Sequence, residues 1–277
     1  MTRRLLTVLL CMLALTVGRV SAQAIRISID AAAEGKEISR DLIGIFYEDL
    51  SHAADGGLYA ELVQNRSFEY SMADHEGWYA LTGWEFVRRD GGDGRLLVDT
   101  SAPVHPNNPH YAVLGVRHGQ GSVGLSNAGF DGIVIREGER YRFSIFARQL
   151  AYPGGPLSVR LEAPDGTLLG GAELPTLTAS WTKYEAMIEA TGSSDDARLV
   201  VLASHPGRIG LDMISLFPEK TFKGRENGLR ADLAQVIADL QPKFVRFPGG
   251  CLAHGDGLDN LYRWKDTIGP VEQRKAQ

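Results

Sequence analysis

The chain has 277 residues, of which 23% are charged and 44% hydrophobic, and its formal net charge is −5 at pH 7. The net negative charge gives no electrostatic attraction to nucleic acid, so the composition does not favour nucleic-acid binding. Beyond the first 22 residues, no apolar run reaches the length of about 20 residues that a membrane-spanning helix needs.

Residues 1–22 have the three parts of a secretory signal peptide: two early arginines, an apolar stretch at 5–17 and a small-residue cleavage site at 20–22. The apolar stretch is short for a membrane anchor. We therefore expect cleavage and export, to the periplasm or the exterior, with no membrane association afterwards. Cleavage removes three arginines and no acidic residue, so the formal charge becomes −8. It also leaves Cys251 as the only cysteine, which excludes an internal disulfide.

Residues 23–66 have the character of an α/β protein. Ala24–Ile29 alternates apolar and polar residues and predicts a short strand. Leu42–Tyr47 is an unbroken apolar run, typical of a strand that is buried on both faces of a parallel sheet. A loop is predicted at Ser51–Gly57, and one or two helical turns at Leu58–Gln64.

Residues 67–218 have little helical periodicity and many turn signals, including the pair Gly170–Gly171. Nine short strands separated by such turns predict an antiparallel β-sandwich or jelly roll. The nine candidates are residues 85–87, 95–98, 111–116, 133–135, 141–148, 157–162, 182–188, 198–203 and 211–217.

Residues 219–277 return to α/β character. The apolar spacing predicts a helix over Gly228–Gln241 and a buried strand over Lys243–Phe247, which ends sharply at Pro248 and two glycines. In α/β folds, ligands bind at the loop that follows such a strand. This loop carries Cys251, His254, Asp256, Asp259, Trp264 and Lys265.

The sequence therefore predicts a sandwich, 67–218, that is inserted into the first βα unit of an incomplete (β/α)8 barrel. The flanks, 23–66 and 219–277, hold about 100 residues, whereas a complete barrel needs roughly 250. We expect this chain to be the amino-terminal part of a longer protein.

Three segments resemble the family-51 glycoside hydrolases, the α-L-arabinofuranosidases. They are Gly44–Asp49 (GIFYED), Gly56–Glu69 (GGLYAELVQNRSFE), and Arg246–Cys251 (RFPGGC) with Trp264–Pro270 (WKDTIGP). The sandwich is similar to the carbohydrate-binding-module-like domain of one branch of that family, through 181–185 and 211–217.

The resemblance implies a retaining hydrolase that releases terminal arabinofuranose from arabinose-containing oligo- or polysaccharides. Such enzymes use two carboxyl groups about 5–5.5 Å apart. In the family both are glutamates on later barrel strands, and the acid/base follows an asparagine. No Asn-Glu pair occurs in these 277 residues, so we expect no catalytic residue here and no activity of this chain alone.

The resemblance also implies part of a sugar pocket. Glu48 matches the glutamate that binds arabinose hydroxyls, and an ionised carboxylate suits a vicinal diol. Gly250 belongs to the turn that approaches the ligand, Cys251 matches a position facing the sugar, and Trp264 matches a tryptophan that lines the pocket. Arg246 is expected to orient carboxylates at the barrel end.

Alternative interpretations remain open. His52, Cys251 and His254 follow neighbouring predicted strands and have side chains that suit zinc. The sandwich could be a non-catalytic sugar-binding protein through Trp78, Tyr79, Trp84, Trp181 and Tyr184, or only a brace for the barrel. Glu69 and Asp212 are candidates for a structural calcium, and no other cofactor is expected. The oligomeric state stays open.

Overall fold

The computed structural model describes residues 25–117, 120–151, 155–255, 257–258 and 260–275. The predicted signal peptide lies outside these residues. The chain divides into two units, Met1–Ser39 and Arg40–Gln277. In the first, the described residues form no strand or helix, and Ile25, Ile27 and Ile29 are exposed. The strand predicted at Ala24–Ile29 is therefore wrong for its described part, because no neighbouring strand pairs with it.

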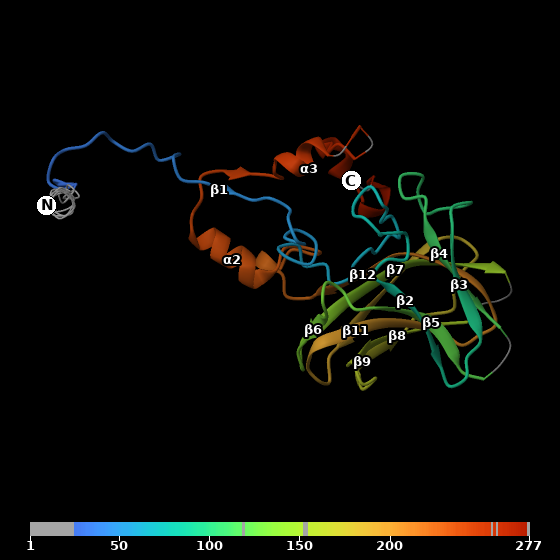
Figure 1. Cartoon of the computed structure of the whole chain (residues 1–277). Helices are drawn as coiled ribbons and strands as arrows, with labels where there is room; N and C mark the ends of the chain where they lie inside the picture. Colours follow the sequence, from blue (N-terminus) through green and yellow to red (C-terminus); the bar gives the residue numbers. More distant parts are fainter. Residues whose placement is uncertain (1–24, 118–119, 152–154, 256, 259, 276–277) are drawn as a thin grey trace, which may run out of the picture. The chain divides into compact units, whose positions relative to one another are not determined.

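The second unit contains two antiparallel sheets (Figure 1). One has the order β10-β7-β12-β4-β3, and the other has the order β2-β5-β11-β8-β9, with β6 pairing with β11. The strands are β2 (Trp84–Arg89), β3 (Gly94–Asp99), β4 (Tyr111–Val116), β5 (Ser122–Asn127), β6 (Ile133–Ile135), β7 (Arg140–Ala151), β8 (Leu157–Glu162), β9 (Leu168–Glu173), β10 (Thr182–Glu189), β11 (Ser194–Ala203) and β12 (Gly207–Pro218).

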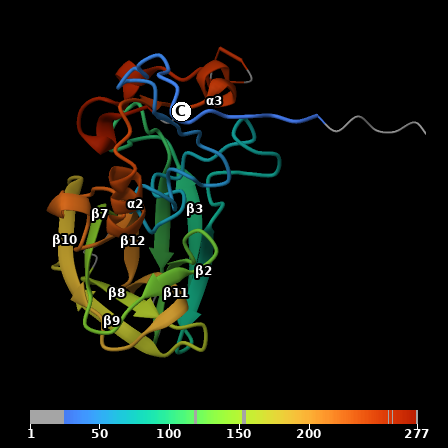
Figure 2. The same cartoon turned by 90° about the vertical axis from the view of Figure 1, so that its left-hand side faces the viewer.

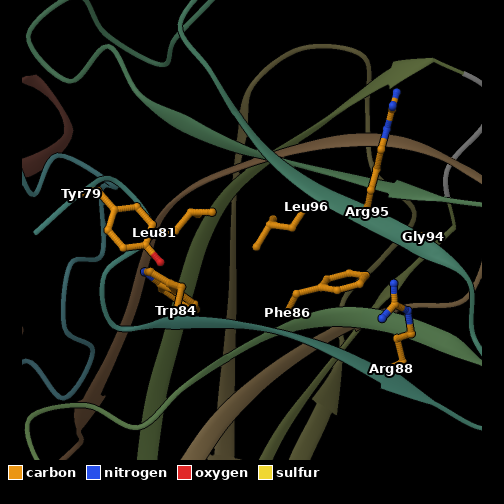
Figure 3. A pocket seen from close by; sticks show the side chains of 8 residues that line it. All are labelled: Tyr79, Leu81, Trp84, Phe86, Arg88, Gly94, Arg95 and Leu96. Atoms are coloured by element: carbon orange, nitrogen blue, oxygen red, sulfur yellow. The ribbon is translucent and has the colours of Figure 1, made fainter. Parts of the chain in front are cut away.

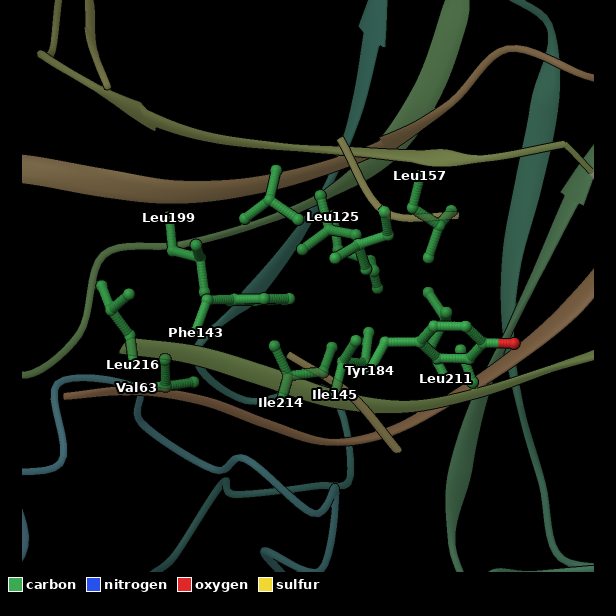
Figure 4. Close-up of a cluster of buried hydrophobic side chains, with 14 of the residues drawn as sticks. Val63, Leu125, Phe143, Ile145, Leu157, Tyr184, Leu199, Leu211, Ile214 and Leu216 are labelled. Atoms are coloured by element: carbon green, nitrogen blue, oxygen red, sulfur yellow. The ribbon is translucent and has the colours of Figure 1, made fainter. Parts of the chain in front are cut away.

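The two sheets share one hydrophobic core. Figure 2 shows the strands of both sheets, and Figure 4 shows side chains of the core. Strand β7 shows the cause, because its residues are alternately buried and half-buried from Tyr141 to Ala147. Phe143 and Ile145 of this strand join Leu157 and Leu199 of the opposite sheet in the core. Alternation of this kind is the signature of a strand with one face on a core.

All nine strands predicted for 67–218 are present, and two further strands, β5 and β9, were missed. The prediction of a turn at Gly170–Gly171 is wrong, because both glycines lie within β9. A Cβ at Gly170 would lie 2.8 Å from the carbonyl oxygen of Glu189, so the glycine permits close approach of two backbones. At Gly124 of β5 an added Cβ would collide with the carbonyl oxygen of Val201.

The remaining elements come from the two ends of the second unit. Strand β1 (Ile45–Phe46) pairs in parallel with β13 (Val245–Arg246), and helix α2 (Ala231–Asp239) precedes β13. Helix α3 (Gly250–His254) and the 3-10 helices η1 (Phe222–Gly224), η2 (Trp264–Thr267) and η3 (Val271–Gln273) complete the list of described elements.

The strands predicted at Leu42–Tyr47 and Lys243–Phe247 are thus shorter than expected. They are also not buried, because Phe46, Val245 and Phe247 are about half exposed. A strand of a parallel sheet becomes buried only when helices cover both faces, and no described element covers this pair in that way.

The helical turns predicted at Leu58–Gln64 are wrong. Leu58 and Gln64 lie in turns and the residues between them form no helix. Ala60 N–H donates to Gly228 O at 3.1 Å, and Leu62 N–H donates to Leu216 O at 2.9 Å. These partners lie far away in sequence, so tertiary pairing overrides the local preference.

The largely β, mixed class that the sequence predicts is confirmed, with short helices only. Within the described residues, no helix has the length and apolar character to cross a bilayer.

Candidate functional site

Glu48 and the turn after β13 lie at the same edge of the two-stranded sheet. The parallel ladder continues past the strands, with Tyr47 N–H donating to Arg246 O at 2.8 Å and Asp49 N–H to Pro248 O at 3.1 Å. Because the strands run in the same direction, their carboxyl ends meet at one edge. The ladder therefore brings together two segments that are 200 residues apart in the sequence.

Gly249 is the residue of this turn that Glu48 touches. A Cβ atom added to Gly249 would collide with Cγ and Oε1 of Glu48, and the φ angle of Gly249 is +105°. Both facts require glycine. In the described part of the chain, the Glu48 carboxylate makes no hydrogen bond or ion pair with another residue. Its oxygens are therefore available to a ligand at the sheet edge.

The other predicted pocket residues follow along the chain. Gly250 begins α3, and the thiol of Cys251 is exposed on this helix. Trp264 begins η2 with 60% of its surface exposed, and its ring lies 5.9 Å from Nζ of Lys265. The structure thus brings Glu48 beside the glycine turn, whereas the one described ring contact of Trp264 is with Lys265.

The expected role of Arg246 in orienting carboxylates stays a prediction. Its guanidinium lies over the ring of Phe46, 4.3 Å from the centroid, and forms no ion pair with a described carboxylate. Phe46 is the Cα partner of Arg246 in the β1–β13 ladder. The contact between the two side chains is a cation–π interaction.

The three candidate zinc ligands do not gather. No group of three acidic, histidine or cysteine side chains with metal-binding geometry is present among the described residues. His52 lies between Trp78 and Phe130, with ring centroids 6.4 and 5.0 Å away. His254 Nδ1 contacts the carbonyl oxygen of Gly255. The contacts of His52 are ring packing, and that of His254 is a local contact with the backbone.

A buried carboxylate that sequence reasoning did not single out lies in the segment that joins β1 to the sheets. Glu61 is 1% exposed and accepts hydrogen bonds from Leu216 N–H at 2.9 Å and Val63 N–H at 3.1 Å. Its second oxygen accepts from Ser215 Oγ and from Arg66 Nη1. Burial raises the pKa of Glu61, and the charge of Arg66 opposes this shift. The role of Glu61 is structural, because groups of the protein itself bind both of its carboxylate oxygens.

Asp212 of β12 is a second buried carboxylate. It is 0% exposed; Oδ1 accepts from Met213 N–H at 2.7 Å, and Oδ2 has no hydrogen-bond partner among the described residues. Burial, together with the nearby charge of Glu69, raises the pKa of Asp212 to about 8. Glu69 accepts from N–H and Nδ1 of His110, at 2.8 and 2.7 Å. The structure thus brings together the two residues considered for calcium, 69 and 212.

The aromatic side chains considered for sugar stacking are mostly occupied. Trp84 and Tyr184 are buried, and Trp181 donates Nε1–H to Ala102 O and packs on Tyr111. Trp78 stacks on Tyr70 at 4.3 Å between centroids. Tyr79 is the one of the five with an exposed ring, at 61%.

The family model and two relatives that match this chain carry the name α-L-arabinofuranosidase. A family model, "Alpha-L-arabinofuranosidase 1 domain", matches residues 236–277. An extracellular exo-alpha-L-arabinofuranosidase of Streptomyces chartreusis is 42% identical over 260 residues, covering 90% of this chain and 30% of that protein. Alpha-L-arabinofuranosidase 1 of Arabidopsis thaliana is 36% identical, covering 91% of this chain and 37% of that protein.

Among solved structures, the arabinose-bound MgGH51 α-L-arabinofuranosidase matches with a TM-score of 0.72 and 33% identity, covering 83% of this chain and 38% of that one. The chain spans about a third of the length of these relatives. Fold and sequence together make it a relative of glycoside hydrolases. More narrowly, its resemblance to the family-51 α-L-arabinofuranosidases is confirmed, and in sequence it extends over nine tenths of the chain.

Proposed function

We propose that this chain is the arabinofuranose-binding part of an α-L-arabinofuranosidase that acts on arabinose-containing polysaccharides by retaining hydrolysis. The observation that carries the proposal is the position of Glu48 beside Gly249, at the carboxyl edge of the β1–β13 pair. The similar proteins of S. chartreusis and A. thaliana, both named arabinofuranosidases, support the choice of activity.

The chemistry of the edge suits a furanose ring. A carboxylate with free oxygens accepts two short hydrogen bonds from neighbouring hydroxyls, and these bonds are stronger than those between neutral groups. Gly250 leaves room for a ring to approach the backbone, since an added Cβ there meets no atom within 4 Å, while Cys251 and Trp264 offer less polar surface. The catalytic glutamate pair is not encoded in these residues, so this part binds and orients the sugar and does not cleave it.

The proposal includes the finer fold: β1, α2 and β13 are elements of a (β/α)8 barrel, and the two-sheet part, 67–218, is inserted between them. Support comes from exposed apolar surface. Leu233, Val236 and Leu240 of the α2 segment are exposed, as are Phe244 and Val245. An apolar stripe at helical spacing packs against a partner surface. Further βα units on both sides of the β1–β13 pair would supply that surface.

Saturation-transfer NMR that measures the binding of L-arabinose to the chain tests the proposed sugar pocket. We expect binding that weakens at least tenfold in Glu48→Gln, because the neutral amide loses the charge-assisted bonds. Glu173→Gln, at the exposed end of β9, is the control and should bind as the parent does. Equal binding by Glu48→Gln would overturn the role of Glu48. We expect no release of arabinose from an aryl arabinofuranoside by the chain alone.

We further propose that the protein is exported. The predicted signal at residues 1–22 and the name of the S. chartreusis relative, an extracellular enzyme, support this. Amino-terminal sequencing of the mature protein from a culture should find Gln23 first. A mature protein that retains residues 1–22 would contradict export with cleavage.

Finally, we propose a structural calcium ion at Asp212 and Glu69. Its support is the buried, unpartnered Oδ2 of Asp212, since a bound cation supplies the missing contact. Calcium prefers six to eight oxygen ligands, so backbone carbonyl oxygens would have to complete the set. Adding calcium after chelation should raise the melting temperature by about 2 °C or more. Asp212→Asn should abolish that rise, whereas the exposed control Asp93→Asn should keep it.

A further inference from the structure

Two hollows lie next to each other along strand β2 and share Tyr79, Leu81 and Trp84. The larger hollow has a volume of 520 Å³. Its lining includes His52 from the loop after β1, Phe130 from the turn between β5 and β6, and Arg198 of β11. The smaller one, of 380 Å³, is shown in Figure 3. Both volumes fall in the range of small-molecule sites, about 300–1,000 Å³. We call the two together the β2 groove.

Tyr79 stands at the centre of the β2 groove with an exposed ring. The turn that carries it is rigid: Tyr79 N–H donates to Thr82 Oγ1 at 2.9 Å, and Thr82 N–H donates to Tyr79 O at 2.8 Å. Below it, Asn65 Nδ2 donates to the carbonyl oxygens of Ala80 and Thr82. A turn that is ordered before binding loses less conformational freedom when a ligand stacks on the side chain that it carries.

The larger hollow has a polar wall with unused hydrogen-bonding capacity. Arg198 Nη1 lies 3.3 Å from Glu85 Oε2, and Arg198 Nε is buried with no hydrogen-bond partner among the described residues. A buried donor without an acceptor is costly. Asp131 and Gln64 add further polar groups to the same hollow. The Arg198 and Glu85 side chains are 42% and 70% exposed, so a hydroxyl group can accept from the Arg198 guanidinium and donate to the Glu85 carboxylate at the same time.

The smaller hollow is lined by apolar side chains together with two arginines, Arg88 and Arg95. Phe86 and Leu96 face each other across it in Figure 3, and the guanidinium of Arg88 lies 4.7 Å from the centroid of the Phe86 ring. The β2 groove therefore combines aromatic rings with polar and charged side chains. Its arginines, 88, 95 and 198, are nearly balanced by Glu85 and Asp131, so its lining does not select a strongly charged ligand.

We propose that the β2 groove binds a neutral polysaccharide chain, with one sugar ring stacked on Tyr79 and a hydroxyl of the chain on Arg198 and Glu85. Sugar rings combine an apolar face with a rim of hydroxyls, which is the pattern that an aromatic platform with planar polar groups recognises. The site is distinct from the Glu48 edge and does not depend on the proposed arabinofuranosidase activity. It would hold the polymer while a side branch is processed elsewhere.

Affinity gel electrophoresis of the whole chain tests this inference, with arabinan, arabinoxylan and polygalacturonate as probes. We expect retardation by at least one neutral polymer. Tyr79→Ala should weaken it at least tenfold, and Tyr79→Phe, which keeps the ring, by about twofold or less. Arg198→Leu should also weaken it. The control Leu168→Ala changes an exposed residue of β9, on the opposite edge of the same sheet, and should have no effect.

Three results would overturn the inference: no retardation by either neutral polymer, retention by polygalacturonate alone, or a Tyr79→Ala variant that binds like the parent. Thermal unfolding of each variant checks that the fold is kept; Tyr79 is exposed, so its change should leave the melting temperature in place. Glu48→Gln should be retarded normally. Failure at the β2 groove and failure at the Glu48 edge are therefore distinguishable.

Discussion

The carboxylate of Glu61 accepts a hydrogen bond from the backbone N–H of Leu216, 155 residues further along the chain, at 2.9 Å. The same carboxylate holds Arg66 at 3.1 Å. It thus fixes the segment that leads from β1 into the sheets against β12, the strand that leads out of them. This single acidic side chain joins the two ends of the two-sheet part.

Glu61→Ala should destabilise the protein by about 3 kcal/mol, because breaking a buried pair leaves an uncompensated charge on Arg66. The free energy of unfolding from urea denaturation measures the effect. Lys220→Ala is the matched control, since its pair with Glu139 is exposed and such pairs contribute about 1 kcal/mol or less. Equal losses for the two variants would contradict the structural role of Glu61.

Asp212 predicts an unusual dependence of stability on pH. Burial raises its pKa to about 8 in the folded protein, from 3.8 for the ordinary group. Between these values the folded state binds more protons than the unfolded state, so the free energy of unfolding should fall as pH rises from about 4 through 8. In a chelating buffer, urea denaturation at pH 5 and pH 9 should show this fall, and Asp212→Asn should reduce it. A variant with the same slope would refute the assignment.

Gly249→Ala should disturb both stability and sugar binding. The new Cβ would collide with Glu48, and φ is +105° there, so we expect a loss of about 1–3 kcal/mol from the strained backbone. The neighbouring Gly250 is the control: a Cβ at Gly250 meets no atom within 4 Å, and alanine favours the helix that it begins. Urea denaturation of the two variants should therefore give opposite signs.

The exposed apolar face of α2 predicts self-association of the isolated chain. Val236→Glu should lower light scattering at high protein concentration, because Val236 is 63% exposed and a charge breaks the apolar patch. Its effect on the unfolding free energy should stay within about 0.5 kcal/mol, as for other surface changes. A buried control, Ala234→Glu, should unfold the helix region instead. Unchanged scattering in Val236→Glu would argue against an uncovered barrel surface.

The sequence predicted most strands because their signal is local. Alternation in β7 and the apolar runs at 42–47 and 243–247 needed no knowledge of distant residues. The pairing of β1 with β13 was also predictable, since a helix and a strand after the inserted segment indicate a parallel partner. Strand β9 was missed because Gly170 and Gly171 were interpreted as a turn, and β5, which contains Gly124, was not predicted. Glycine at these positions permits the close approach of neighbouring backbones.

The candidate site was predictable only in part. Glu48 and the glycine turn follow from strand ends that meet at one edge. The direction of Arg246, the non-helical path of Leu58–Gln64 and the occupied oxygens of Glu61 depend on contacts across more than 150 residues. No spacing in the sequence encodes such contacts. The sequence also did not show that Tyr79 is exposed while the other four aromatic residues considered for sugar stacking are not.

The adjacent backbone bonds at Leu62–Leu216 and Ala60–Gly228 put the entrance and the exit of the two-sheet part next to each other. Neighbouring extended segments lie about 4.8 Å apart, so a few residues suffice to close the chain where that part is cut out. With this geometry, removal of the two-sheet part would leave two chain ends that already lie side by side.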